Sequence, residues 1–274
     1  MLTFPNAKIN LGLNVLARRP DGYHAIESVF VPVQLNDVLE VIIAPELGTN
    51  ELAYTRSGIH IPGELDSDLC SKAVRLLQQG RELPGLRMHL HKAIPLGAGL
   101  GGGSSDAAHA LRAINTLCRL GLGADELAHH ALKLGSDCPF FLHGDACIVR
   151  GRGEVLAPVE LDLGGHWIVL MNPGIHVSTA EAYRHTIPTG TSWDIEGMLR
   201  NGPGPSWSKE LPNTMEPWVL TTYPMVGMLK EHLIRMGAYY TAMSGSGSTV
   251  FGLFKEEPAL PGLPPEVAVW KLRC

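Results

Sequence analysis

The sequence has few of the features that mark a secreted, membrane or nucleic-acid-binding protein. Its five cysteines, an odd number, include no C-x-x-C pair, which argues against a disulfide framework or a zinc site. No apolar run reaches the length of a membrane span, and the formal net charge of −5 gives no electrostatic reason to bind nucleic acid. We therefore expect a cytoplasmic protein that binds neither membrane nor nucleic acid. We also expect a monomer or weak homodimer.

Glycine, in contrast, is concentrated in one segment, which runs from Pro95 to Ala108. Five glycines, two serines and an aspartate precede an alanine-rich helical pattern there. Glycine lets backbone N–H groups approach a ligand closely, and the start of a helix adds free donors and about half a positive charge. The segment therefore predicts a phosphate-binding loop. Its candidate ATP-binding residues are Pro95, Leu96, Gly97, Ala98, Gly99, Leu100, Gly101, Gly102, Gly103, Ser104 and Ser105.

Three other interpretations of this loop fit less well. The spacing Gly97-x-Gly99-x-x-Gly102 matches a dinucleotide-binding turn, but the acidic residue expected about 20 residues later, at the end of a strand, is missing. The Walker A pattern requires a lysine before the hydroxyl residue, and here Ser104 follows Gly103 directly. A flexible turn is disfavoured because a strand and a capped helix flank the segment.

In its surroundings the loop resembles the second signature of the GHMP kinases, the superfamily of galactokinase, homoserine kinase, mevalonate kinase and phosphomevalonate kinase. Residues 4–13 resemble the first signature of that superfamily, and residues 242–251 resemble the third. Within the superfamily, residues 7–11, 18–24 and 134–141 are similar to the branch whose substrate is 4-diphosphocytidyl-2-C-methyl-D-erythritol, a cytidine diphosphate-linked methylerythritol.

The hydrophobic pattern predicts an α+β protein, and the resemblance implies the two-domain GHMP kinase fold with its active site in the cleft between the domains. We place the domain boundary near residue 150, which gives domains 1–150 and 151–274. Residues 189–217 are rich in Gly, Pro, Ser and Trp, and we expect an irregular insertion or a lid there. The expected strands cover residues 7–16, 26–43, 86–90, 146–149, 166–171, 239–243, 249–254 and 267–272, and the expected helices cover residues 66–77, 104–118, 125–134 and 224–237.

The resemblance implies ATP-dependent phosphorylation of the 2-hydroxyl group of that substrate, a step of the non-mevalonate route to isoprenoid precursors, with ATP and Mg²⁺ as cofactors. Lys8 is the only cation in the apolar run 7–17, and Asp137 stands between a helix end and another apolar run. Read from the residues alone, the two could form a structural ion pair. In the family, the matching lysine and aspartate are the catalytic pair. Ser104 or Ser105 is a candidate Mg²⁺ ligand, although either can instead cap the helix.

On the substrate side, the resemblance implies that Tyr23 and Tyr183 sandwich the cytosine ring while His24 hydrogen-bonds its edge. Asn10 lies two residues from Lys8 on a strand, hence on the same face, and fits a contact to the methylerythritol or phosphate end. Another GHMP kinase, of the homoserine or mevalonate type, and a catalytically silent nucleotide-binding relative are the alternative functions. The chain also departs from the family pattern, with Thr214 standing where aspartate is usual.

Overall fold

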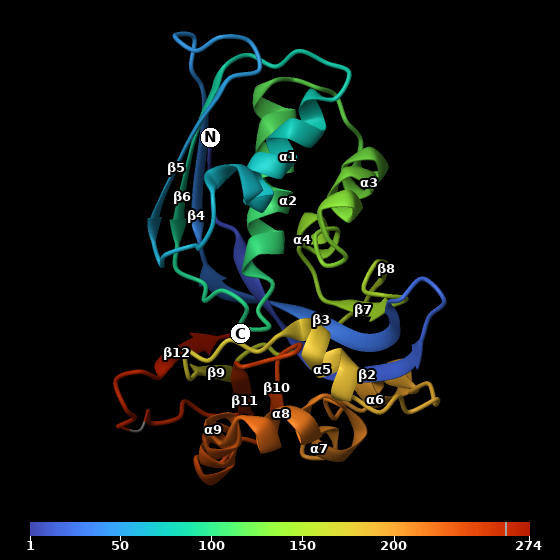
Figure 1. Cartoon of the computed structure of the whole chain (residues 1–274). Coiled ribbons are helices and arrows are strands. Elements are labelled where there is room, and N and C mark those ends of the chain that lie inside the picture. The colour runs from blue at the N-terminus through green and yellow to red at the C-terminus, as the bar shows by residue number, and fades with distance from the viewer. Residues whose placement is uncertain (261) are drawn as a thin grey trace. The chain divides into compact units, whose positions relative to one another are not determined.

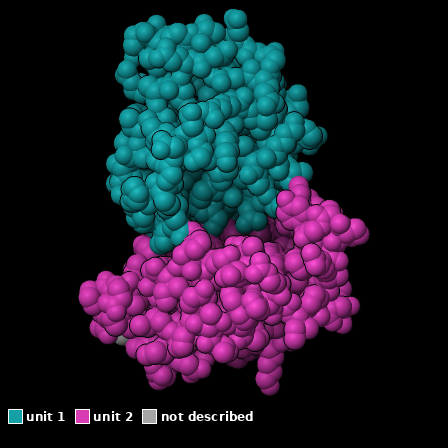
Figure 2. Space-filling view, viewed as in Figure 1, with its two compact units in different colours: residues 1–7, 35–96, 101–144 teal, residues 8–34, 97–100, 145–274 magenta. Residues whose placement is uncertain are grey.

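The computed structural model describes residues 1–260 and 262–274, which form two compact units that interleave along the chain (Figure 2). Unit 1 comprises Met1–Ala7, Leu35–Leu96 and Gly101–Gly144, and unit 2 comprises Lys8–Gln34, Gly97–Leu100 and Asp145–Cys274. The chain crosses from unit 1 to unit 2 for the last time after Gly144, near the domain boundary predicted at residue 150. The sequence did not predict the earlier crossings, and the domain boundary itself stays a prediction.

Unit 1 is a four-stranded sheet with helices against one face (Figure 1). The strand order is β1 (Leu2–Thr3), β4 (Val38–Ile43), β6 (Leu86–Lys92) and β5 (Leu52–Gly58), with β5 parallel to β6 and the other pairs antiparallel. Alternate residues of the sheet pack with apolar residues of the helices into one core, because neighbouring residues of a strand point to opposite faces. The helices are α1 (Leu69–Gln78), α2 (Gly102–Leu117), α3 (Ala124–Leu134) and α4 (Phe140–His143).

Unit 2 contains two further four-stranded sheets. In the first, the order is β2 (Asn6–Arg18), β3 (His24–Asn36), β7 (Cys147–Arg150) and β8 (Val155–Pro158). In the second, the order is β10 (Tyr240–Met243), β11 (Val250–Phe254), β9 (Trp167–Asn172) and β12 (Ala268–Arg273), all antiparallel. Its helices are α5 (Thr179–His185), α6 (Ile195–Arg200), α7 (Trp207–Glu210), α8 (Glu216–Thr222) and α9 (Pro224–Arg235), the last of which packs on the second sheet.

Several predicted elements needed correction. The strand predicted over residues 26–43 is broken at Asp37, which separates β3 from β4. The helix predicted to begin at residue 66 begins at Leu69, because residues 65–67 form a 3₁₀ turn and the side chain of Asp68 caps the helix by accepting the N–H of Cys70. The segment 189–217, predicted to be irregular, contains α6 and α7. The sequence analysis also did not predict β1, β5, β8, α4, α5 and α8.

Among the described residues, no helix combines the length and apolarity needed to cross a membrane.

Candidate active site

The glycine loop connects β6 to α2, and its middle belongs to unit 2. Gly101 directly precedes α2 with a φ of 70°, a left-handed conformation that glycine adopts without strain. Gly99 also has a positive φ, and a Cβ atom added to it would lie 1.8 Å from the carbonyl oxygen of Ser244. The backbone conformation at Gly101 and Gly99, and the close packing of Ser244 on Gly99, therefore both require glycine in this loop.

The first motif lies beside the middle of this loop, in unit 2. The Lys8 N–H donates to the carbonyl oxygen of Leu100 at 2.9 Å, and the buried Lys8 ammonium donates to Asn10 Oδ1 at 2.5 Å. The ammonium also lies 4.4 Å from the ring centroid of Phe30. Asn10 Nδ2 in turn donates to Ser28 Oγ at 2.9 Å. The contact between Lys8 and Asn10 confirms that the two side chains share one face of β2.

The third motif packs on the same part of unit 2. Ser244 Oγ donates to the carbonyl oxygen of Gly99 at 2.8 Å and contacts Asn10 Oδ1 at 3.4 Å. The Thr249 N–H donates to the carbonyl oxygen of Ala98 at 3.3 Å. Three segments more than 80 residues apart in sequence therefore meet through direct hydrogen bonds. Such a meeting is the expected property of one composite site.

Asp137 belongs to unit 1, in the turn between α3 and α4. Its carbonyl oxygen accepts the N–H of Phe140 at 3.2 Å, and its side chain is partly exposed. Burial raises the pKa of the neighbouring Cys138 thiol to about 12, although the Ser104 hydroxyl acts in the opposite direction, so the thiol stays protonated near neutral pH. The aspartate therefore lies in a short hydrogen-bonded turn beside a protonated thiol.

The two serines of the loop differ in exposure. Ser104 is partly exposed, whereas Ser105 is completely buried and its hydroxyl has no hydrogen-bond partner in the described part of the chain. Of the two, Ser104 is therefore the one that a ligand can reach. Within the described residues, no group of three or more His, Cys, Asp or Glu side chains could hold a metal ion.

The aromatic residues predicted to bind the base lie in unit 2. The rings of His24 and Tyr183 stack directly, with centroids 4.8 Å apart and an interplanar angle of 12°. Two rings at this distance are in contact, so no base fits between them in this conformation. Tyr23 is exposed, and the guanidinium of Arg152 lies 4.8 Å from its ring centroid. Burial, assisted by the charge of Arg18, lowers the pKa of His24, which favours its neutral form.

Arg152 was not identified as a site residue from the sequence, which indicated only a domain boundary near residue 150. Gly151 has a φ of 73°, and the backbone N–H of Arg152 donates to Glu154 Oε2 at 2.6 Å. This turn holds the guanidinium over Tyr23. A guanidinium on an aromatic face adds a cation–π contact, so Arg152 supports the exposed tyrosine.

The segment after α5 is fixed to β2 and β3 within unit 2. Glu27 is buried and accepts hydrogen bonds from Ser192 Oγ at 2.5 Å and from the Trp193 N–H at 2.9 Å. Thr214, which stands where the family usually has aspartate, donates its hydroxyl to the Leu13 carbonyl at 3.0 Å and accepts the Val15 N–H at 3.1 Å. The segment is therefore a packed part of unit 2, and Thr214 acts there as a backbone partner.

The other two tryptophans of this region are also packed. Trp207 is fully buried with its ring edge-on to Tyr240, and Trp218 stacks on His185 with centroids 4.8 Å apart. These contacts favour a structural role for both.

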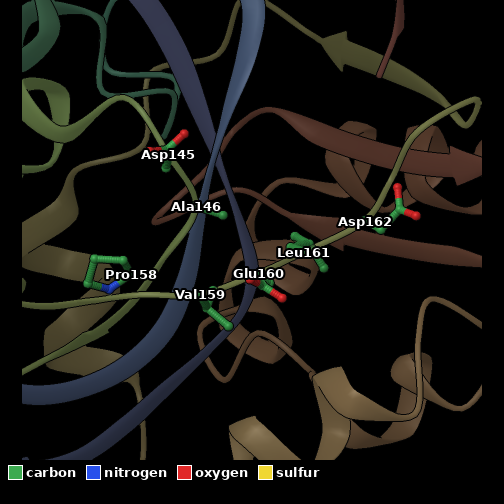
Figure 3. A pocket seen from close by; sticks show the side chains of 7 residues that line it. All are labelled: Asp145, Ala146, Pro158, Val159, Glu160, Leu161 and Asp162. Atoms are coloured by element: carbon green, nitrogen blue, oxygen red, sulfur yellow. The ribbon is translucent and has the colours of Figure 1, made fainter.

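Among the described residues, two of the cavities lie outside these clusters. One of about 450 Å³ runs along β5 in unit 1 and is lined mainly by residues 54–61. It adjoins Lys92, whose carbonyl oxygen accepts the Ile59 N–H at 2.8 Å. Another, of about 580 Å³, lies in unit 2 among residues 145–146 and 158–162 (Figure 3). No predicted site residue lines the second cavity, although its walls carry three carboxylates.

Comparisons with known proteins agree with this picture. The family model described as GHMP kinases N terminal domain matches residues 68–145, and the model described as GHMP kinases C terminal matches residues 199–261. The chain is 46% identical over 259 residues to a 4-diphosphocytidyl-2-C-methyl-D-erythritol kinase of Cytophaga hutchinsonii, covering 94% of each chain. It is 42% identical over 261 residues to the protein of that name from Bacteroides thetaiotaomicron, covering 95% of this chain and 94% of the relative.

Solved structures are similar over the same extent. A crystal structure of 4-(cytidine 5'-diphospho)-2C-methyl-D-erythritol kinase matches with a TM-score of 0.79 and 33% identity, covering 94% of this chain and 91% of that one. The mevalonate kinase of Methanococcus jannaschii matches with a TM-score of 0.72 at 14% identity, covering 100% and 98%, which is a likeness of fold alone. The α+β fold with GHMP N- and C-terminal domains, predicted from the sequence, is confirmed.

Proposed function

Because the chain belongs to the GHMP kinases, and within them to the family of 4-diphosphocytidyl-2-C-methyl-D-erythritol kinases, we propose that it transfers the γ-phosphoryl group of ATP to the 2-hydroxyl group of that substrate. The reaction is a step of the non-mevalonate route to isoprenoid precursors. The observation that best supports this function is the meeting of the three motifs around the glycine loop in unit 2.

The glycine loop is the proposed site for the phosphates of ATP. Its backbone N–H groups and the N-terminus of α2 provide donors to a polyphosphate without side chains in the way. The cavity along β5 lies in the same unit as the beginning of α2 and is large enough for a base and ribose. We assign the nucleoside end of ATP to that cavity.

Lys8 and Asp137 are the proposed catalytic pair. Asp137 would accept the proton of the 2-hydroxyl group, and the Lys8 ammonium would stabilise negative charge that develops during the transfer. A loose, metaphosphate-like transition state lets that proton leave late, so a weak base is sufficient. The hydrogen bond to Asn10 keeps the ammonium in one orientation.

A magnesium ion is the second cofactor that we propose. The residues fit a metal held mainly by the phosphates of ATP, because the loop offers one accessible hydroxyl, that of Ser104, and the described residues contain no group of three or more His, Cys, Asp or Glu side chains that could hold a metal ion. When bound, Mg²⁺ neutralises charge on the phosphates. Ser105 is less suitable because it is buried.

We further propose that the cytosine ring stacks on Tyr23 and Tyr183 and that His24 reads its edge. Since His24 now covers one face of Tyr183, a base that uses this face must displace the imidazole ring. The neutral form of His24 has both a donor and an acceptor nitrogen for an amide-like base edge. Other GHMP activities, of the homoserine or mevalonate type, are not favoured, because curated relatives at 40–46% identity carry the cytidyl kinase name.

Replacing Tyr183 by alanine is expected to raise KM for the cytidyl substrate about 10- to 100-fold, because stacking on a base is worth ~1–3 kcal/mol. The KM for ATP should stay unchanged. Steady-state kinetics with each substrate varied in turn measures both values. Tyr183→Phe retains the ring and is the matched control, with only a mild expected effect.

The assignment itself is tested by single-turnover assays of the wild-type protein with ATP and three kinds of alcohol. The cytidyl substrate should be phosphorylated efficiently, and methylerythritol 4-phosphate, which lacks the base, should react very poorly. Efficient phosphorylation of that truncated alcohol, of homoserine or of mevalonate would contradict the proposed function. No turnover of any of them would support a silent nucleotide-binding protein instead.

A further inference from the structure

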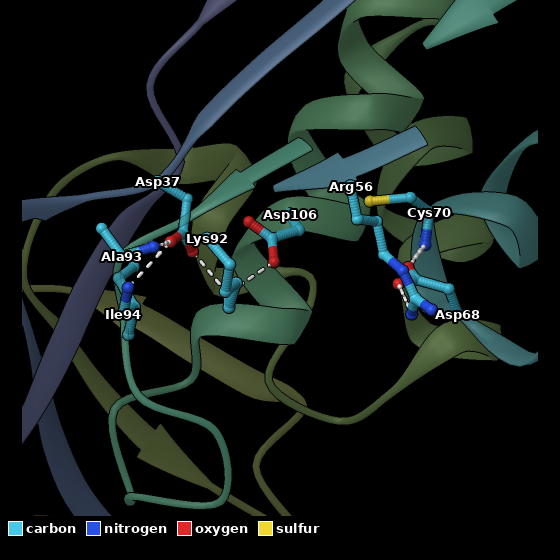
Figure 4. Close-up of polar contacts among 8 residues, drawn as sticks. All are labelled: Asp37, Arg56, Asp68, Cys70, Lys92, Ala93, Ile94 and Asp106. Atoms are coloured by element: carbon cyan, nitrogen blue, oxygen red, sulfur yellow. Dashed lines mark hydrogen bonds and ion pairs between the residues drawn. The ribbon is translucent and has the colours of Figure 1, made fainter. Parts of the chain in front are cut away.

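A buried cluster of three charged residues underlies the two ends of the glycine loop in unit 1 (Figure 4). Lys92, the last residue of β6, has a side chain with no exposed surface. Its ammonium donates to Asp37 Oδ2 and to Asp106 Oδ2, the latter at 2.6 Å. The sequence showed Asp106 as the aspartate of the glycine segment but did not indicate Asp37 or Lys92, because the three residues come from separate segments.

Asp37 holds the strand end that leads into the loop. Its Oδ1 atom accepts the backbone N–H groups of Ala93 at 2.6 Å and of Ile94 at 2.8 Å. Both residues directly precede Pro95, where the loop begins. The backbone of Asp37 is itself fixed, since its N–H donates to the carbonyl oxygen of Pro5 at 2.8 Å. One carboxylate therefore orients the backbone at the start of the loop and also binds the ammonium.

Asp106 and Gly102 bring the other end of the loop to the same ammonium. Asp106 lies on α2, about one turn after Gly102, where that helix begins. A Cβ atom added to Gly102 would lie 2.9 Å from Lys92 Nζ and 2.9 Å from Ile94 Cγ2. The first residue of α2 thus packs directly on Lys92. Both ends of the loop are held by one side chain and its two partners.

The charges of the cluster are unequal in number, with two carboxyl groups around one ammonium. Although burial alone lowers the pKa of Lys92, Asp106 and Asp37 together raise it, so the ammonium stays charged. Burial raises the pKa of Asp106 well above its ordinary value, and the charge of Asp37 adds to this effect while Lys92 opposes it. Asp106 Oδ1 is buried without a hydrogen-bond partner in the described part of the chain. The ammonium is therefore shared by two carboxyl groups, and burial of Asp106 favours the protonated form of its side chain.

We propose that Asp37, Lys92 and Asp106 form a positioning clamp that sets the separation and direction of the two ends of the glycine loop, and thereby the affinity for ATP. This proposal rests on the proposed function, in which the loop binds the phosphates of ATP. The clamp residues act through the loop and are not catalytic. Buried ion pairs are a weak source of stability because desolvation offsets their attraction. In this cluster the hydrogen bonds are instead concentrated where the loop begins and ends.

The clamp predicts different effects for two isosteric substitutions. In Asp37→Asn, the amide oxygen can still accept the N–H groups of residues 93 and 94, but the amide nitrogen then faces the ammonium, which loses one of its two carboxylate partners. We expect KM for ATP to rise about 10- to 100-fold, since misplacing a binding group by about 1 Å can cost 10²-fold. The KM for the cytidyl substrate should remain at the wild-type value. Asp106→Asn should have little effect, because its amide oxygen can still accept from the ammonium while its amide nitrogen takes the place of Oδ1, which has no hydrogen-bond partner in the described part of the chain.

Steady-state kinetics and calorimetric titration with ATP measure these effects, and Leu77→Ala is the control for lost stability. Leu77 is a fully buried core residue of α1, so its truncation destabilises unit 1 without altering the clamp. If Asp37→Asn does not fold, the charge-neutral Asp37→Asn/Lys92→Met double variant replaces it, with the same expected rise in KM for ATP.

The two hypotheses fail in different ways. Wild-type protein that neither binds nor hydrolyses ATP in the presence of its substrate would overturn the proposed function. Wild-type protein that binds ATP normally, together with a folded Asp37→Asn or double variant of unchanged ATP affinity, would overturn the clamp alone. An equal loss of ATP affinity in Leu77→Ala would also overturn it, since general destabilisation would then account for the effect.

Discussion

Asp137→Asn is expected to lower kcat by about 10²–10⁴, the usual contribution of a positioned general base. Asparagine retains the shape of the side chain and the turn in which the carbonyl oxygen of residue 137 accepts the Phe140 N–H. The KM values for ATP and the cytidyl substrate should therefore change little. Steady-state kinetics together with thermal unfolding separates lost chemistry from lost structure.

Asp125→Asn is the matched control for this substitution. Asp125 is an exposed residue in the first turn of α3, in the same unit as Asp137, and its replacement should leave kcat at the wild-type value. Near-normal turnover in Asp137→Asn would restrict that carboxylate to a structural role and would require a different proton acceptor.

Gly101→Val is expected to abolish detectable ATP binding. The residue has a φ of 70°, which a β-branched side chain adopts only with strain, and the new methyl groups would lie where α2 presents its free N–H groups. Isothermal titration with ATP measures the loss. Gly121→Val provides a matched control, because Gly121 has the same φ of 70° and no atom within 4 Å of an added Cβ.

Retention of ATP affinity in a folded Gly101→Val protein would rule out the loop as the phosphate site. Gly102→Val is a less informative substitution. A side chain at residue 102 would collide with Lys92 and Ile94. Its effect would therefore combine loss of phosphate space with disruption of the clamp.

Local backbone conformation and side-chain direction could be predicted directly from the sequence. Positive φ at Gly97, Gly99 and Gly101 follows from the density of glycine, and the shared face of Lys8 and Asn10 follows from the alternation of a strand. The long, strongly periodic helices, such as α2 and α3, were predicted to within two residues at each end. These features depend on short-range sterics and on hydrophobic periodicity, which a linear sequence carries.

Where the hydrophobic periodicity of the sequence was weak, tertiary contacts determined the secondary structure. The segment 189–217 contains short helices because buried partners such as Trp207 and Leu199 stabilise turns that are too short to form by propensity alone. Thr214 replaces a carboxylate of the family pattern, and only its contacts with Leu13 and Val15 reveal its role.

By itself, the sequence determined the position of the glycine loop, the identity of the family and the fold class, because these depend on residue types at fixed local spacing. Only the tertiary structure shows that Asp37 separates β3 from β4 and that its side chain binds Lys92 and the backbone N–H groups just before the glycine loop. It also decided that His24 rests on Tyr183 and Arg152 on Tyr23. Each of these contacts joins residues more than 50 positions apart in the sequence. Such pairings are chosen by the burial and charge balance of the folded chain, and no local pattern in the sequence records them.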